Sequence, residues 1–172
     1  GLDLEHISSI NLVVKKGVVP NAATLAVRFG NIPYIPAIIN DPDLTSADIS
    51  RLTGFLQAIS FGSDAPNGIG TATYSQAGDT QFSIAYNVTA ANSFAGAIAT
   101  FDDYGTTGIV ESRDLRSVTN FTLGLSLSGG TGDVTLEFQD NTGAKRSVTL
   151  SAVGVSERFY QVPLSSFSGL DL

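Results

Sequence analysis

Short segments in which apolar and polar residues alternate recur along most of this 172-residue chain. The clearest covers residues 121–127, where every second residue is large and apolar: Phe121, Leu123, Leu125 and Leu127. A period of two places such side chains on one face of an extended strand, whereas a helix repeats its apolar residues every three or four positions. Glycine-rich turn residues follow at 128–133. This pattern predicts antiparallel strands that each bury one face.

Similar segments, separated by turn-forming residues, occupy most of the remaining chain: 7–14, 23–29, 71–74, 81–88, 94–101, 134–138, 147–153 and 158–164. The composition agrees, because 18 glycines and only 15% charged residues suit many short strands joined by turns. We therefore predict one all-β domain, an antiparallel jelly-roll β-sandwich.

One stretch departs from this pattern. Residues 31–44 contain three prolines and predict an extended linker. Residues 45–60 begin with a capping-box pattern and repeat apolar residues at helical spacing, which predicts one short amphipathic helix. The expected organisation is thus closing strands in residues 1–30, the linker, the helix, and a jelly-roll body in residues 61–172.

The tetrapeptide Gly-Leu-Asp-Leu stands at residues 1–4 and again at residues 169–172. Residues 164–172 have no continuation, and residues 5–14 read as the strand that would follow them. We interpret this as a repeat opened within a unit, so that the last strands of the fold come first.

Five segments of the body have a familiar pattern: residues 86–89, 94–101, 114–127, 134–143 and 159–172. They resemble the galactose-binding-like jelly rolls of noncatalytic carbohydrate-binding modules and of tandem repeats in large bacterial surface proteins. The resemblance covers about residues 65–172 and implies an extracellular or cell-surface location. In that family, segments like 7–14 and 24–29 follow the body, whereas here they precede it.

Two interpretations of residues 1–30 stay open. They can complete the sandwich of a neighbouring copy, which gives head-to-tail assembly by β-strand complementation and a structural subunit of a filament or surface array. The donated apolar residues would then be Ile7, Ile10, Leu12, Val14, Leu25, Val27 and Phe29. Alternatively, they fold back on their own domain as a circular permutant, which favours a carbohydrate-binding module with a glycan as its partner.

Two kinds of ligand site follow from the resemblance and from side-chain chemistry. Family members often hold a structural Ca²⁺ at strand ends, and the candidate ligands here are Asp102, Asp103, Asp140 and Asp171, for which turn capping is the alternative role. Sugars stack on aromatic rings, and without tryptophan the best exposed platform is Tyr104, since core packing better suits Tyr86 and Tyr160.

Other classes of function fit less well. A net charge of −7 argues against nucleic acid and against anionic membranes. No segment has the length and apolarity of a membrane span. His6 is the only histidine, and no nucleophile elbow or phosphate loop is present. We predict a protein that is not an enzyme.

Overall fold

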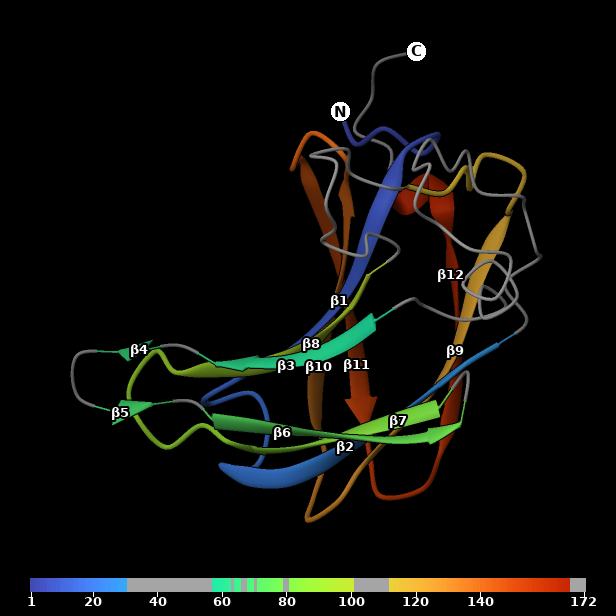
Figure 1. Cartoon of the computed structure of the whole chain (residues 1–172). Coiled ribbons are helices and arrows are strands. Elements are labelled where there is room, and N and C mark those ends of the chain that lie inside the picture. The colour runs from blue at the N-terminus through green and yellow to red at the C-terminus, as the bar shows by residue number, and fades with distance from the viewer. Residues whose placement is uncertain are drawn as a thin grey trace.

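The computed structural model describes the backbone of residues 1–30, 57–62, 64–65, 68–69, 71–78, 81–100 and 112–167, and the side chains of residues 1–30, 81–100 and 112–167. These residues form two five-stranded antiparallel sheets and one small hairpin (Figure 1). The first sheet has the order β11-β10-β1-β8-β3, and the second has the order β12-β9-β2-β7-β6. One apolar core contains residues of both sheets, so the predicted all-β sandwich is confirmed.

The strands of the first sheet are β1 (Ile7–Lys15), β3 (Gln57–Gly62), β8 (Phe94–Thr100), β10 (Gly132–Asp140) and β11 (Lys145–Val153). Those of the second are β2 (Ala22–Phe29), β6 (Thr71–Gly78), β7 (Gln81–Asn87), β9 (Asn120–Leu127) and β12 (Arg158–Pro163). The small hairpin joins β4 (Asp64–Ala65) to β5 (Gly68–Ile69), and a 3-10 turn, η2 (Leu164–Ser166), follows β12. Apart from their end residues, the nine segments with alternating residues all became strands.

The predicted helix is wrong where the structure describes it. Residues 57–60 belong to β3, which pairs with β8 so that Ile59 lies opposite Ile98. The sequence of β3 also alternates, with Ile59 and Phe61 between smaller residues, and pairing with β8 decides between the two periods. Residues 45–56 and the predicted linker at 31–44 lie outside the described residues.

The strands β1 and β2 stand in the middle of the two sheets (Figure 1). β1 pairs with β10 on one side and β8 on the other, so Leu12 lies opposite both Leu136 and Ala97. β2 pairs in the same way with β7 and β9. All of these partners belong to the same chain, so in this structure residues 1–30 close their own sandwich.

The core lies between the sheets and follows directly from the alternation. On β1, large inward side chains lie opposite alanines of β8, as in the pair of Ile10 with Ala99. Four aromatic rings, those of Phe29, Phe121, Phe138 and Phe167, then connect the second sheet to the first and to the end of η2. Their centroids are 5.7, 5.3 and 4.4 Å apart in that order. The first two distances lie within the range of favourable aromatic pairs, and the third lies at its lower limit.

Candidate functional site

The residues expected to form a strand-donor interface are all buried in this structure. None of the seven is more than 4% exposed. Three of them, Ile10, Leu12 and Val14, face inward from β1, while Leu25, Val27 and Phe29 face inward from β2. Burying a side chain of this size stabilises a fold by about 1.5–3 kcal/mol, so the interface formed by residues 7–29 is energetically large.

The backbone of this segment is as fully engaged as its side chains. The ladder between β1 and β8 runs without interruption from Ser9 opposite Thr100 to Lys15 opposite Phe94. Without residues 1–30, β10 would lose its partner β1, and β2 would no longer join β9 to β7. Each sheet would then divide into two halves with open edges, which are prone to pair with other chains. The sandwich is therefore complete only when something occupies the places of β1 and β2.

The turn between β1 and β2 is fastened to the start of β10. The amide of Asp133 donates a hydrogen bond to the carbonyl oxygen of Val18, with a nitrogen–oxygen distance of 3.0 Å. Next to it, Gly132 has no room for a side chain, because a methyl group there would lie 2.7 Å from the Cα atom of Val19 and overlap the carbonyl oxygen of Val18. Only glycine allows this close approach of two backbones.

Asp140 is the one proposed Ca²⁺ ligand that the structure describes. It is 2% exposed at the end of β10. Its Oδ2 accepts a hydrogen bond from the amide of Asp3, with a nitrogen–oxygen distance of 3.0 Å. Its Oδ1 accepts three hydrogen bonds from the following turn, donated by the amide and hydroxyl of Thr142 and by the amide of Ala144. Burial acts to raise the pKa of this carboxyl, but these hydrogen bonds outweigh it and lower the pKa. This geometry is that of a turn cap.

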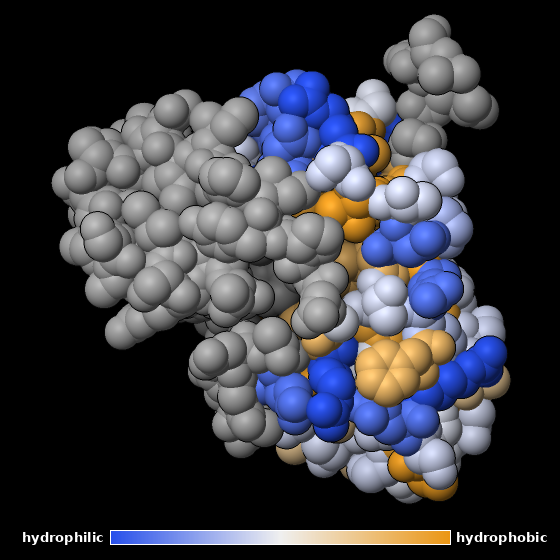
Figure 2. All heavy atoms as spheres, turned by 90° about the vertical axis from the view of Figure 1, so that its right-hand side faces the viewer, coloured by the Kyte–Doolittle hydropathy of each residue, from blue (hydrophilic) through white to orange (hydrophobic). Residues whose placement is uncertain are grey.

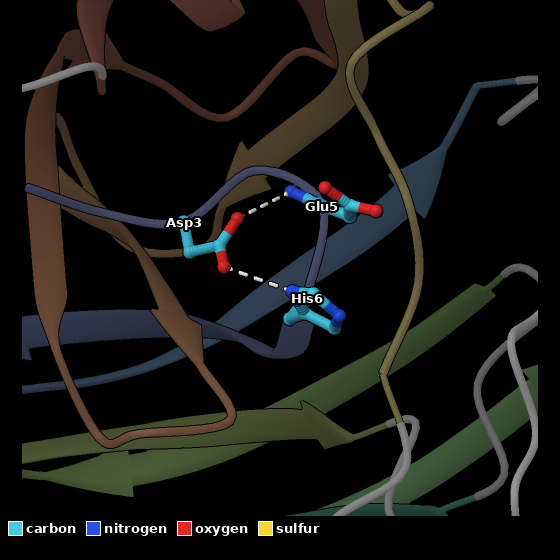
Figure 3. Close-up of side chains that lie close together, drawn as sticks. All are labelled: Asp3, Glu5 and His6. Atoms are coloured by element: carbon cyan, nitrogen blue, oxygen red, sulfur yellow. Dashed lines mark hydrogen bonds and ion pairs between the residues drawn. The ribbon is translucent and has the colours of Figure 1, made fainter.

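The remaining predicted ligand residues, Asp102, Asp103, Asp171 and Tyr104, lie outside the described residues. A different acidic group lies just before β1, where single ligand atoms of Asp3, Glu5 and His6 come within 4.8 Å of one another (Figure 3). Asp3 Oδ1 accepts the Glu5 amide at 2.9 Å, and Asp3 Oδ2 lies 2.8 Å from His6 Nδ1. These contacts order the turn that leads into β1.

A guanidinium group offsets part of the negative charge of this cluster. Arg116 places Nη1 2.8 Å from Glu5 Oε2 and Nη2 2.6 Å from Asp114 Oδ2. The hydrogen bonds from Arg116 lower the pKa of Asp114. The group therefore has the character of a solvent-exposed ion-pair network, which fastens the chain before β1 to the segment before β9.

The structure separates the aromatic residues into buried and exposed ones. Tyr86 is 4% exposed, and burial raises its pKa to about 12. Tyr160 packs against the core, and its hydroxyl donates a hydrogen bond to the carbonyl oxygen of Ser151, with an oxygen–oxygen distance of 3.0 Å. Phe159, in contrast, is 54% exposed. The sequence indicated this exposure. Tyr160 and Val162 face inward from β12, so Phe159, one position before Tyr160, lies on the outward face of the strand.

Comparisons with protein-family models, with curated proteins and with solved structures found no match to this chain. Among the described residues, no helix has the length and apolarity needed to cross a membrane. The residues and their geometry therefore carry the functional argument.

Proposed function

We propose that this chain is a noncatalytic structural module whose copies assemble head to tail by exchange of the segment that carries β1 and β2. The observation that supports this is the place of those two strands. One terminal segment supplies the middle strand of both sheets, so whichever chain provides residues 1–30 completes the unit.

The same pairings serve equally well within one chain and between chains. In an exchanged assembly, Leu12 would still lie between Leu136 and Ala97, but of a second copy. Residues 31–56 separate these two strands from β3, the next strand that the structure describes, and this number of residues is enough to reach another sandwich. Since both forms bury equal surface, protein concentration and the connection decide between them.

Exchange of this kind is heterologous, because each copy gives its first strands and receives those of another. Such contacts extend into a filament when their rotation does not close into a ring. We propose that the module builds an elongated structure outside the cell, a location that rests on the resemblance to repeats of surface proteins. The carbohydrate-binding alternative through Tyr104 and a Ca²⁺ site that includes Asp102, Asp103 and Asp171 stay predictions.

Light scattering after size-exclusion chromatography of the full chain tests this proposal. Protein refolded at high concentration should contain dimers and longer oligomers that return to monomer only after unfolding, since the exchanged strands are fully paired. The control is Thr149→Lys, which adds a charge to the exposed edge strand β11 and blocks edge-to-edge pairing without touching β1 or β2. Oligomers that vanish in this variant, or a chain that stays monomeric after refolding, would overturn the proposal.

A further inference from the structure

The first four residues of the chain, which precede β1, are held by the body of the sandwich. The side chain of Leu2 is 7% exposed, and Leu4 packs against the same core. The amide of Asp3 donates a hydrogen bond to Asp140 Oδ2, with a nitrogen–oxygen distance of 3.0 Å. The carbonyl oxygen of Leu4 accepts one from the amide of Leu115 at 2.8 Å. We call this place the tetrapeptide seat and define it by Asp140, Leu115 and the part of the core beside Leu2.

The sequence that fills the seat, Gly-Leu-Asp-Leu, occurs again at residues 169–172, which lie outside the described residues. The contacts with the seat use leucine side chains and backbone groups, so an identical sequence can make all of them. Leu170 would then take the buried position, and the amide of Asp171 would donate to Asp140. The seat therefore has two matching segments within one chain.

The chain that leads to the second tetrapeptide is anchored close to the seat. Phe167, at the end of η2, is fully buried, and its ring centroid lies 4.4 Å from that of Phe138. Phe138 and Asp140 are both buried and two residues apart on β10, so they lie on the same face about 7 Å apart along the strand. Figure 1 shows η2 at the end of the sandwich where β1 begins.

This anchor favours the tetrapeptide of the same chain over that of a neighbouring copy. Residues 168–172 span up to about 17 Å when extended, which is more than twice the separation of Phe138 from Asp140 along β10. A segment tethered this closely has a high effective concentration at the seat. Binding within one chain should therefore be independent of protein concentration.

An empty seat would expose apolar atoms and leave a buried carboxylate without one of its donors. Asp140 is 2% exposed, and its Oδ2 would lose the amide of Asp3 if residues 1–4 moved away. Loss of a hydrogen bond to a buried charged group is costly. Figure 2, which keeps the same end of the molecule at the top, shows hydrophilic atoms gathered there with apolar atoms directly below them.

We propose that residues 169–172 bind the tetrapeptide seat of their own chain when residues 1–4 leave it. The two tetrapeptides then compete for one site. Withdrawal of β1 no longer leaves the seat empty, so binding of the second tetrapeptide favours the open form from which strands are exchanged. This consequence rests on the proposed strand exchange, whereas the binding itself concerns a single chain.

Nuclear magnetic resonance of the full chain with carbon-13-labelled leucine methyl groups tests the binding on monomer isolated by size-exclusion chromatography. The Leu170 signals are those that disappear in Leu170→Ala. Leu2→Ala weakens the first tetrapeptide, so in this variant the Leu170 signals should move from the positions of an exposed leucine to those of a buried one. A merely structural role of Leu2 would not move them.

Thermal unfolding provides a second measurement, because two interchangeable segments protect each other. We expect Leu2→Ala combined with Leu170→Ala to lower the melting temperature by at least about 4 °C more than the two single substitutions added together. The matched control combines Leu2→Ala with Ser168→Ala, which lies outside the tetrapeptide, and its effects should be additive.

Leu170 signals that stay in place in Leu2→Ala would overturn the proposal, as would additive melting temperatures in the Leu2→Ala and Leu170→Ala pair. A shift of the Leu170 signals that grows with protein concentration would assign the binding to a neighbouring copy and also overturn it. Both measurements use the monomer, so their failure would leave the light-scattering test of strand exchange unaffected.

Discussion

Replacing Gly132 by alanine would insert a methyl group where the turn between β1 and β2 meets the start of β10. The nearest atoms are the Val18 carbonyl oxygen and the Cα atom of Val19, the latter at 2.7 Å. Both belong to the backbone, so no side-chain rotation can relieve the overlap. Separating the two segments would also stretch the 3.0 Å hydrogen bond from Asp133 to Val18. Overpacking typically costs about 1–3 kcal/mol, and the hydrogen bond adds about 1 kcal/mol.

We therefore expect Gly132→Ala to lower the free energy of unfolding by about 2–4 kcal/mol. Urea unfolding followed by circular dichroism measures this difference, and a substituted protein that does not fold would agree with the upper end. The matched control is Gly154→Ala, where the closest atom to the added methyl group is a threonine hydroxyl at 3.7 Å. If both variants were as stable as the original protein, the turn of residues 16–21 would not lie against β10.

Two further substitutions examine the core and the turn after β10. Leu12→Ala removes a buried side chain from the middle strand of the first sheet and should lower the free energy of unfolding by about 2–5 kcal/mol. Val13→Ala, on the outward face of the same strand, should lower it by less than half as much. Equal urea midpoints for the two variants would contradict this. Hydrogen bonding lowers the pKa of Asp140 below its ordinary value of 3.8. The contribution of its carboxylate to the free energy of unfolding is therefore present above that pH and is lost as the pH falls further toward the folded-state pKa. Asp140→Asn should be less stable than the original protein near neutral pH, and its melting temperature should fall less steeply as the pH is lowered. Parallel curves of melting temperature against pH for the two proteins would show that the Asp140 carboxylate does not stabilise the fold.

The strands could be predicted from the sequence because burial of one face imposes a period of two. This holds well for β9, where Phe121 to Leu127 alternates without a break. It failed for residues 57–60, since Ile59 also fits a helical spacing and only the pairing with β8 selects the strand. Local patterns record which face is buried, whereas strand order depends on contacts between residues far apart in sequence.

The roles of individual residues were harder to predict from the sequence for the same reason. From the sequence, Asp140 fits both a metal ligand and a turn cap. The hydrogen bonds that it accepts from the amides of Asp3 and Thr142 favour the turn cap, and only the fold brings Asp3 close to Asp140. Phe159 occupies an outward strand position in the sequence, but only the fold places it opposite Gly124. Residues 7–15 and 22–29 form strands where the alternation predicted them, but the sequence pattern did not predict their central place in both sheets.

Strand exchange requires that β1 of one copy occupy the place beside β10 of another. Val13 of β1 and Thr135 of β10 are directly paired, and the chain contains no cysteine. Residues opposite each other in antiparallel strands are close enough for a disulfide. A Val13→Cys chain mixed with a Thr135→Cys chain and refolded together can therefore join in a mixed dimer through these two positions only when strands are exchanged.

Non-reducing electrophoresis after mild oxidation reads the result directly. We expect a mixed disulfide-linked dimer that becomes more abundant with protein concentration during refolding. This dimer should be absent when Thr149→Cys, on the edge strand β11, replaces Thr135→Cys. If the two chains stay unlinked at every concentration, or if both cysteine positions link equally well, residues 1–30 serve only their own chain and the proposed assembly is wrong.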